Sequence, residues 1–239
     1  MFTATTFYRI CIGLMGAVSV RGDCLIEPDK DGSVVISDGT ETIAPGAFSD
    51  CDALKKIVIP ASVKNIGAFA FHSAVNLKKV VFREGSNLKD IDFVAFNSCV
   101  SLKKFDFPKS LTKIGAQAFS YSGLQRVSFK NGIGHIGNDA FSFCNIKKIT
   151  FPRSLRTIGK NAFYSSGLEV VLFSIWKNPK FLFSRLQKIG PQAFQGNEKL
   201  KTINVPTLLF IGKNVFKKTG CPSGTFIPGV SIKNCIVIE

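Results

Sequence analysis

The sequence repeats one short phrase eight times: an isoleucine, usually a glycine, two variable residues, a small residue that is usually alanine, and a phenylalanine. The isoleucines are Ile43, Ile66, Ile91, Ile114, Ile136, Ile158, Ile189 and Ile211, and the phenylalanines are Phe48, Phe71, Phe96, Phe119, Phe141, Phe163, Phe194 and Phe216. A period in the low twenties is typical of a solenoid, whose units are too small to bury their own apolar faces and are stabilised by stacking. We therefore predict one elongated domain with the phenylalanines in a buried column.

Each unit also contains an alternating apolar run before the repeated phrase. In Leu54–Pro60 the spacing LxxIxI places apolar residues on one face of a strand and polar residues on the other. We predict a strand, a tight turn and a short helical segment in each unit. The expected organisation is an N-terminal cap with a partial repeat over residues 20–42, eight units over residues 43–216 and a C-terminal cap over residues 217–239.

Two units read LKKIVIPASVKNIGAFAF and IKKITFPRSLRTIGKNAF, and this pattern resembles the BspA-type leucine-rich repeats over roughly residues 34–232. The resemblance implies an α/β leucine-rich-repeat solenoid that is right-handed, with a parallel sheet on its concave face and short turns or helices on its convex face. Many members of that family are secreted or cell-surface proteins of microbes, and several are linked to adhesion or host recognition. The family supplies no catalytic motif.

The charge is concentrated in the repeats, because the net charge is +15 overall but −5 over residues 1–52. A basic surface implies acidic partners. Pairs of basic residues recur at the same strand positions in consecutive units, as a ladder that consists of Lys55, Lys56, Lys78, Lys79, Lys103, Lys104, Arg126, Lys147 and Lys148. The ladder ends at Glu169-Val170 and Lys201-Thr202. The ladder either binds a polyanion, or it reflects a solvent-exposed lysine that was copied when the repeats were duplicated.

The unit that starts at Ile158 is longer than the others, and its surplus lies between Phe173 and Leu186. Insertions in repeat proteins map to loops on one face, which is often the binding face. This one contains the only tryptophan of the chain among basic residues: Trp176, Lys177, Lys180 and Arg185. The segment either contacts a partner or folds back over the flank of the solenoid.

Three of the seven cysteines fall in one column, three residues after the repeated phenylalanine. Cys51, Cys99 and Cys144 lie in alternate repeats, about 9 to 10 Å apart in a parallel stack, which is too far for disulfides between them. We predict three buried thiols. Cys24, Cys221 and Cys235 lie outside this column, and a Cys221–Cys235 bridge could close the C-terminal cap in an oxidising compartment.

Residues 1–19 do not fit the repeat and resemble a short secretory signal peptide, with the mostly apolar stretch Ile10–Val18 before a small residue, Ser19. The alternative is that they form an N-terminal cap. No stretch approaches the 18 apolar residues that a membrane-spanning helix needs.

The sequence offers little for catalysis, and we expect no enzyme, cofactor or metal site. Gly132–Gly137 matches GxGxxG, but its last glycine is the repeat glycine and no long helix follows. The only histidines, His72 and His135, lie three repeats apart.

We therefore predict a secreted or cell-surface adhesion or recognition protein that binds a protein or a sulfated or acidic glycan, rather than nucleic acid. The alternative is a cytosolic protein-interaction scaffold with no polyanion ligand.

Overall fold

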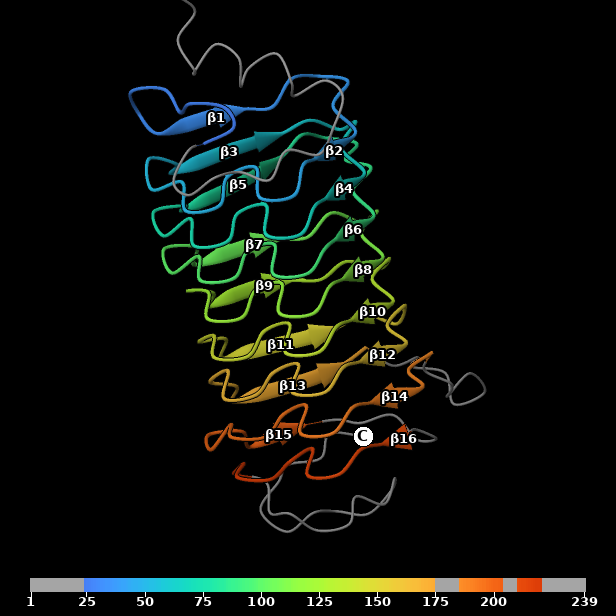
Figure 1. Cartoon of the computed structure of the whole chain (residues 1–239). Coiled ribbons are helices and arrows are strands. Elements are labelled where there is room, and N and C mark those ends of the chain that lie inside the picture. The colour runs from blue at the N-terminus through green and yellow to red at the C-terminus, as the bar shows by residue number, and fades with distance from the viewer. Residues whose placement is uncertain (1–23, 175–184, 204–209, 221–239) are drawn as a thin grey trace, which may run out of the picture.

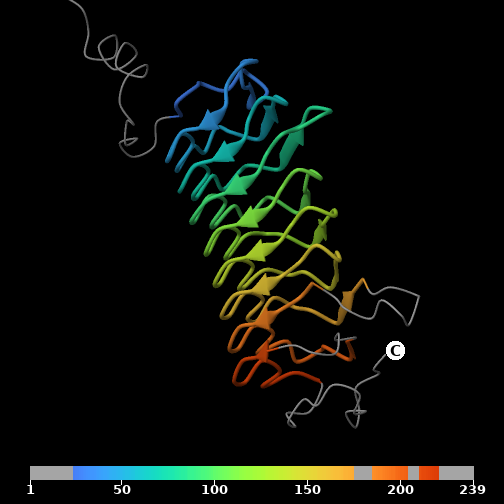
Figure 2. The ribbon, with the colours of Figure 1, turned by 90° about the vertical axis from the view of Figure 1, so that its right-hand side faces the viewer.

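In the computed structural model, which describes residues 24–174, 185–203 and 210–220, the chain winds into an elongated coil (Figure 1). Successive turns of the coil stack along one direction, and each turn supplies one strand to each of two rows (Figures 1 and 2). All the strand pairs are parallel, as the sequence predicts for a solenoid. The short helices expected in each unit are absent from the described residues, so this part of the chain is a β-solenoid and not an α/β fold.

The even-numbered strands form one continuous eight-stranded sheet. They are β2 (Thr42–Ile43), β4 (Asn65–Ile66), β6 (Asp90–Ile91), β8 (Lys113–Ile114), β10 (His135–Ile136), β12 (Thr157–Ile158), β14 (Lys188–Ile189) and β16 (Phe210–Ile211). Each strand ends on one of the eight repeated isoleucines, and the register pairs every isoleucine with the next along the sheet. The pairing of β12 with β14 shows that this sheet continues across the long unit.

The odd-numbered strands form the second row, which divides into three short sheets. The first sheet holds β1 (Ser33–Val35), β3 (Lys56–Ile59) and β5 (Lys79–Phe82); the second holds β7 (Lys104–Asp106) and β9 (Arg126–Ser128); the third holds β11 (Lys148–Phe151), β13 (Val170–Phe173) and β15 (Thr202–Ile203). Their side chains alternate between the two faces. In β11, Ile149 and Phe151 are buried, while Lys148 and Thr150 are exposed.

The third side of the coil is made of turns, and its hydrogen bonds explain why no helix forms there. In one unit, the N–H groups of Gln117, Phe119 and Tyr121 donate to carbonyls of the following unit at 2.8, 2.8 and 3.0 Å. The residues two positions before and two positions after each repeated phenylalanine have φ between 47° and 78°, in the left-handed region. Alternate N–H groups are thus committed to the next unit, and left-handed residues interrupt any right-handed helix.

The repeated phenylalanines form the predicted column inside the coil. Neighbouring rings stack nearly parallel along its whole length, with centroids 4.7 to 5.7 Å apart. This spacing follows the separation of about 4.8 Å between adjacent parallel strands. Inward-facing phenylalanines of the odd-numbered strands, such as Phe105 and Phe151, contact the column edge-on. The core therefore runs without interruption from β2 to β16.

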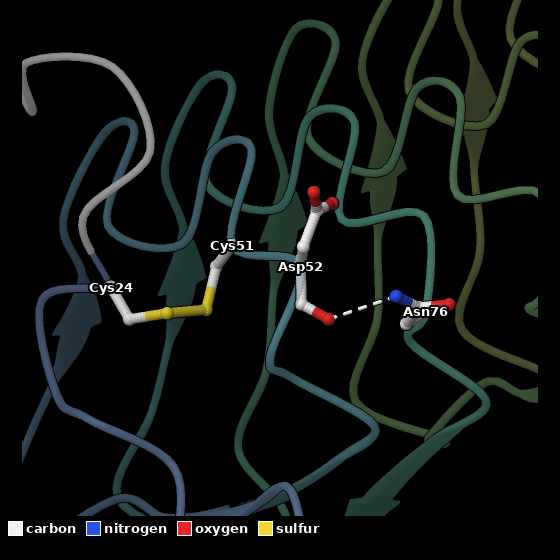
Figure 3. Close-up of a disulfide and its surroundings, with 4 residues drawn as sticks. All are labelled: Cys24, Cys51, Asp52 and Asn76. Atoms are coloured by element: carbon white, nitrogen blue, oxygen red, sulfur yellow. Dashed lines mark hydrogen bonds between the residues drawn. A yellow bond between two sulfur atoms is a disulfide. The ribbon is translucent and has the colours of Figure 1, made fainter.

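The N-terminal end is closed by a disulfide between Cys24 and Cys51, whose Cα atoms are 5.2 Å apart (Figure 3). The prediction that Cys51 is a free thiol was therefore wrong. The spacing rule excluded bridges within the cysteine column, but Cys24 reaches Cys51 from the cap that precedes the first full repeat. The backbone N–H of Leu25 also donates to the carbonyl of Ala47 at 2.8 Å. The cap is thus attached to the first repeat by both bonds.

Cys99 and Cys144 are buried free thiols, as predicted. Their Sγ atoms donate to the carbonyls of Phe71 and Phe119 at 3.0 and 3.2 Å. Burial raises the pKa of the Cys144 thiol to about 12 and also raises the pKa of Cys99. Both thiols are therefore protonated at neutral pH. The signal-peptide prediction and the Cys221–Cys235 bridge concern residues outside the described part of the chain.

Candidate basic interface

The basic ladder lies on the outward face of the odd-numbered strands, which we call the lysine face. Its nine members are Lys55, Lys56, Lys78, Lys79, Lys103, Lys104, Arg126, Lys147 and Lys148, and all nine are exposed. Within two of the short sheets, strand register aligns the second residue of each pair: Lys56 lies opposite Lys79, and Lys104 lies opposite Arg126. The structure therefore places these side chains on one surface.

The first residue of each pair forms a parallel column just before the strands. The N–H of Lys78 donates to the carbonyl of Lys55 at 2.8 Å, and the N–H of Gln125 donates to that of Lys103 at 3.0 Å. Adjacent members of a column are about 4.8 Å apart at the backbone. Two like charges at that separation repel by about 0.9 kcal/mol in water before salt screening. An anionic ligand would relieve this repulsion.

Three of the nine cations already have partners on the protein. Lys104 pairs with Asp106 at 2.7 Å, Lys147 pairs with Glu169 at 3.8 Å, and the Nζ of Lys103 donates to the carbonyl of Val100 at 2.7 Å. Within the described residues no ion pair involves the other six, which are Lys55, Lys56, Lys78, Lys79, Arg126 and Lys148. Sequence reasoning treated the nine as equivalent, but the structure separates six free cations from three that are partly satisfied.

The lysine face stops at β13, where the outward positions are Val170 and Leu172. Glu169 precedes them and forms the ion pair with Lys147 at 3.8 Å. This is the interruption expected from the sequence. Of the residues singled out in the long insertion, Arg185 is exposed, whereas Trp176, Lys177 and Lys180 lie outside the described residues.

Some of the hollows on the surface of the described coil are lined by basic residues. One, of about 460 Å³, crosses β8, β10, β12 and β14 on the even-numbered sheet and has Gly115, Gly137, Gly159 and Gly190 in its lining. Lys113, His135, Lys160 and Lys188 also line it. Another, of about 590 Å³, lies on the lysine face between β9 and β11.

The repeat glycines have a packing role. A Cβ on Gly137 would lie 2.6 Å from the backbone nitrogen of Ala116 in the preceding unit, so no larger residue fits without a shift. A Cβ on Gly132 would collide with the carbonyl oxygen of Lys109. Two of the three glycines of the GxGxxG match thus have a packing explanation, whereas a Cβ on Gly134 would find its nearest neighbour at 3.7 Å. In the described part of the chain, no group of three or more His, Cys, Asp or Glu residues is arranged to hold a metal ion.

The model of the BspA type leucine-rich repeat region matches residues 41–169 and 177–234, in six copies. The chain belongs to the BspA-type leucine-rich repeat family. The sequence resemblance is thereby confirmed, and this repeat family is typically non-catalytic. Within the described residues, no helix is long and apolar enough to cross a membrane.

Solved structures of bacterial leucine-rich repeat proteins share this fold. The T. pallidum leucine-rich repeat protein is 29% identical, with a TM-score of 0.62 over 72% of this chain and 79% of its own. A Bacteroides ovatus protein is 22% identical (TM-score 0.55, over 78% of this chain), and the pneumococcal vaccine antigen PcpA is 24% identical (TM-score 0.53, over 77% of this chain). This chain spans 61% of the Bacteroides ovatus chain and 53% of the PcpA chain. No curated protein is significantly similar to it.

Sequence reasoning missed the polar groups of the groove between β9 and β11. Ser128, Thr150 and Asn131 line it beside Arg126 and Lys148. Ser128 and Thr150 follow the ladder residues by two positions and so share their outward face. The alternation of side chains along a strand could have identified Ser128 and Thr150 from the sequence as outward-facing residues. It could not have shown that they line a groove. The groove itself depends on the gap between two sheets of the odd-numbered row.

Proposed function

We propose that this protein is an exported, non-catalytic repeat scaffold for adhesion or recognition, and that its lysine face binds an acidic macromolecule. The carrying observation is that six free cations are exposed along one row of strands, two of which, Lys56 and Lys79, lie opposite each other in register. Charged side chains held in register repel one another less when an anion lies across them. A solenoid offers the length of surface that a macromolecular ligand would cover.

The disulfide between Cys24 and Cys51 supports export. Disulfides form and persist in oxidising environments and are rare in the reducing cytosol. The bridge also connects two positions that are 27 residues apart, as in a structural staple. This observation favours the exported protein over the cytosolic scaffold. It agrees with the proposed signal peptide over residues 1–19.

The binding proposal predicts a strong dependence on salt. We expect labelled heparin to bind the full chain, and its binding constant to fall by at least about 100-fold between about 50 and 500 mM salt, because several ion pairs form with release of counterions. Fluorescence anisotropy at a series of salt concentrations measures this constant, with uncharged dextran as the control. A constant that does not change with salt, or equal binding of dextran, would contradict electrostatic binding by the lysine face.

A further inference from the structure

The groove between β9 and β11 differs from the rest of the lysine face because cations flank it at both ends. Arg126 of β9 and Lys148 of β11 line one end, and Lys130 lines the other. Arg126 and Lys130 are four residues apart along an extended segment, which corresponds to about 13 Å. No acidic residue lines the groove. Its charge is therefore complementary to a ligand with at least two separated anionic groups.

Neutral hydrogen-bonding groups lie between these cations. The outward positions that follow Arg126 and Lys148 are Ser128 and Thr150, and Asn131 lies beyond them. Hydroxyl and amide side chains can each donate and accept hydrogen bonds. On β3 and β5 the corresponding outward residues are Val58 and Val81, and on β7 the position holds Asp106, which is paired with Lys104. Of these strands, β9 and β11 alone combine free cations with a polar floor.

The groove is supported from below and at one end. The ring of Phe129 stacks on those of Phe107 and Phe151, at centroid distances of 4.9 and 5.9 Å. The hydroxyl of Ser154 accepts from the backbone N–H of Gly132 at 3.0 Å and donates to the carbonyl of Ile133 at 2.7 Å. These contacts fix the loop after β9 against the next unit. Little ordering is then required when a ligand binds.

Anionic groups separated by a neutral, hydroxyl-bearing segment are the chemistry of a sulfated glycan. An acidic polypeptide would bring carboxylates without the intervening hydroxyls, and single-stranded nucleic acid favours exposed aromatic platforms. The one aromatic residue that lines the groove, Phe129, is partly buried and is already stacked between two other rings. The polar floor therefore favours the glycan.

We infer that the groove between β9 and β11 is the principal subsite for a sulfated glycan on the lysine face. Arg126, Lys148 and Lys130 bind its sulfate groups, and Ser128 and Thr150 bind its sugar hydroxyls. This inference rests on the proposed function, since it names the ligand class and the place where the ligand is held most tightly. The remaining free cations of the lysine face contribute long-range attraction.

The test compares three charge-matched triple variants by calorimetric titration with a size-defined heparin oligosaccharide. One removes the groove cations (R126Q, K130Q and K148Q), one removes cations elsewhere on the lysine face (K55Q, K56Q and K79Q), and one removes cations that line the hollow on the even-numbered sheet (K113Q, K160Q and K188Q). We expect affinity losses of about 100-fold, 10-fold and less than 3-fold, because paired charges in a shaped site contribute more than exposed charges. Unchanged melting temperatures establish that each variant folds.

A fourth variant, S128V with T150V, keeps every charge. We expect it to bind about 10-fold more weakly with the same salt dependence, because only neutral hydrogen bonds are lost. Wild-type affinity of this variant, or equal losses in the first two triple variants, would overturn the subsite while leaving the lysine face as the binding surface. Tighter binding of poly-glutamate than of the heparin oligosaccharide would overturn the ligand class. Absence of binding by the wild-type chain would overturn the proposed function itself.

Discussion

Replacing Phe119 by alanine should lower the free energy of unfolding by about 4 kcal/mol, the usual cost of deleting a fully buried ring. The Phe119 ring lies between those of Phe96 and Phe141, with centroids 5.1 and 5.2 Å away. Phe105 and Phe107 contact its edges at 5.0 and 5.6 Å. Because each unit is stabilised by its neighbours, a cavity at this level weakens two interfaces at once. Urea unfolding followed by circular dichroism measures the loss.

Phe143→Ala is the matched control, since it removes the same atoms from the adjacent repeat. Phe143 is 44% exposed and stacks on Tyr121 at the surface, with centroids 4.7 Å apart. We expect a loss of about 1 kcal/mol or less, as for other surface substitutions. Similar losses for the two variants would contradict a buried phenylalanine column as the main source of stability.

Removing the disulfide should be the second large effect. In the double variant C24S/C51A we expect the free energy of unfolding to fall by about 3.5 kcal/mol, because a bridge over a loop of this length restricts the unfolded chain. The two cysteines are 27 residues apart, and the bridge attaches the cap to the first repeat. Reductant added to the wild-type protein should have a similar effect. Urea unfolding with and without reductant gives both values.

Cys99→Ala provides the comparison, because Cys99 occupies the same column as Cys51, is buried and has no disulfide. We expect it to cost about 1 kcal/mol, through the loss of one small buried side chain. If C24S/C51A and C99A are equally stable, or if reductant changes neither the midpoint nor the slope of wild-type unfolding, the bridge does not stabilise the cap.

The repeat period was enough to predict the isoleucine and phenylalanine columns. Both columns consist of residues that occupy the same position in every unit. Such residues lie next to one another when the units stack. The pairing of Ile158 with Ile189 shows that this holds even across the long unit. The outward position of Lys56 and Lys79 followed from the same rule, combined with the alternation of side chains in strands.

The short helical segments were predicted incorrectly because the conformation of this side of the coil is imposed by neighbouring units. Val94 has a φ of 61°, although a β-branched residue disfavours the left-handed region. Its N–H donates to the carbonyl of Ala116 in the next unit at 3.0 Å, which maintains this geometry. Local propensity could not reveal this. The groove between β9 and β11 was missed for a similar reason, since it depends on where one short sheet ends and the next begins.

Lysine footprinting tests most directly whether the lysine face is the binding surface. The folded protein is acylated with and without heparin, and the modification of each lysine is measured by mass spectrometry. The account predicts at least about fivefold protection of Lys55, Lys56, Lys78, Lys79 and Lys148, because bound sulfate groups cover their ammonium groups. Lys113, Lys160 and Lys188, which line the hollow on the even-numbered sheet, should change less than about twofold, since distant exposed charges are screened. Protection of Lys113, Lys160 and Lys188, with the lysine face left reactive, would contradict the claim that the lysine face is the binding surface.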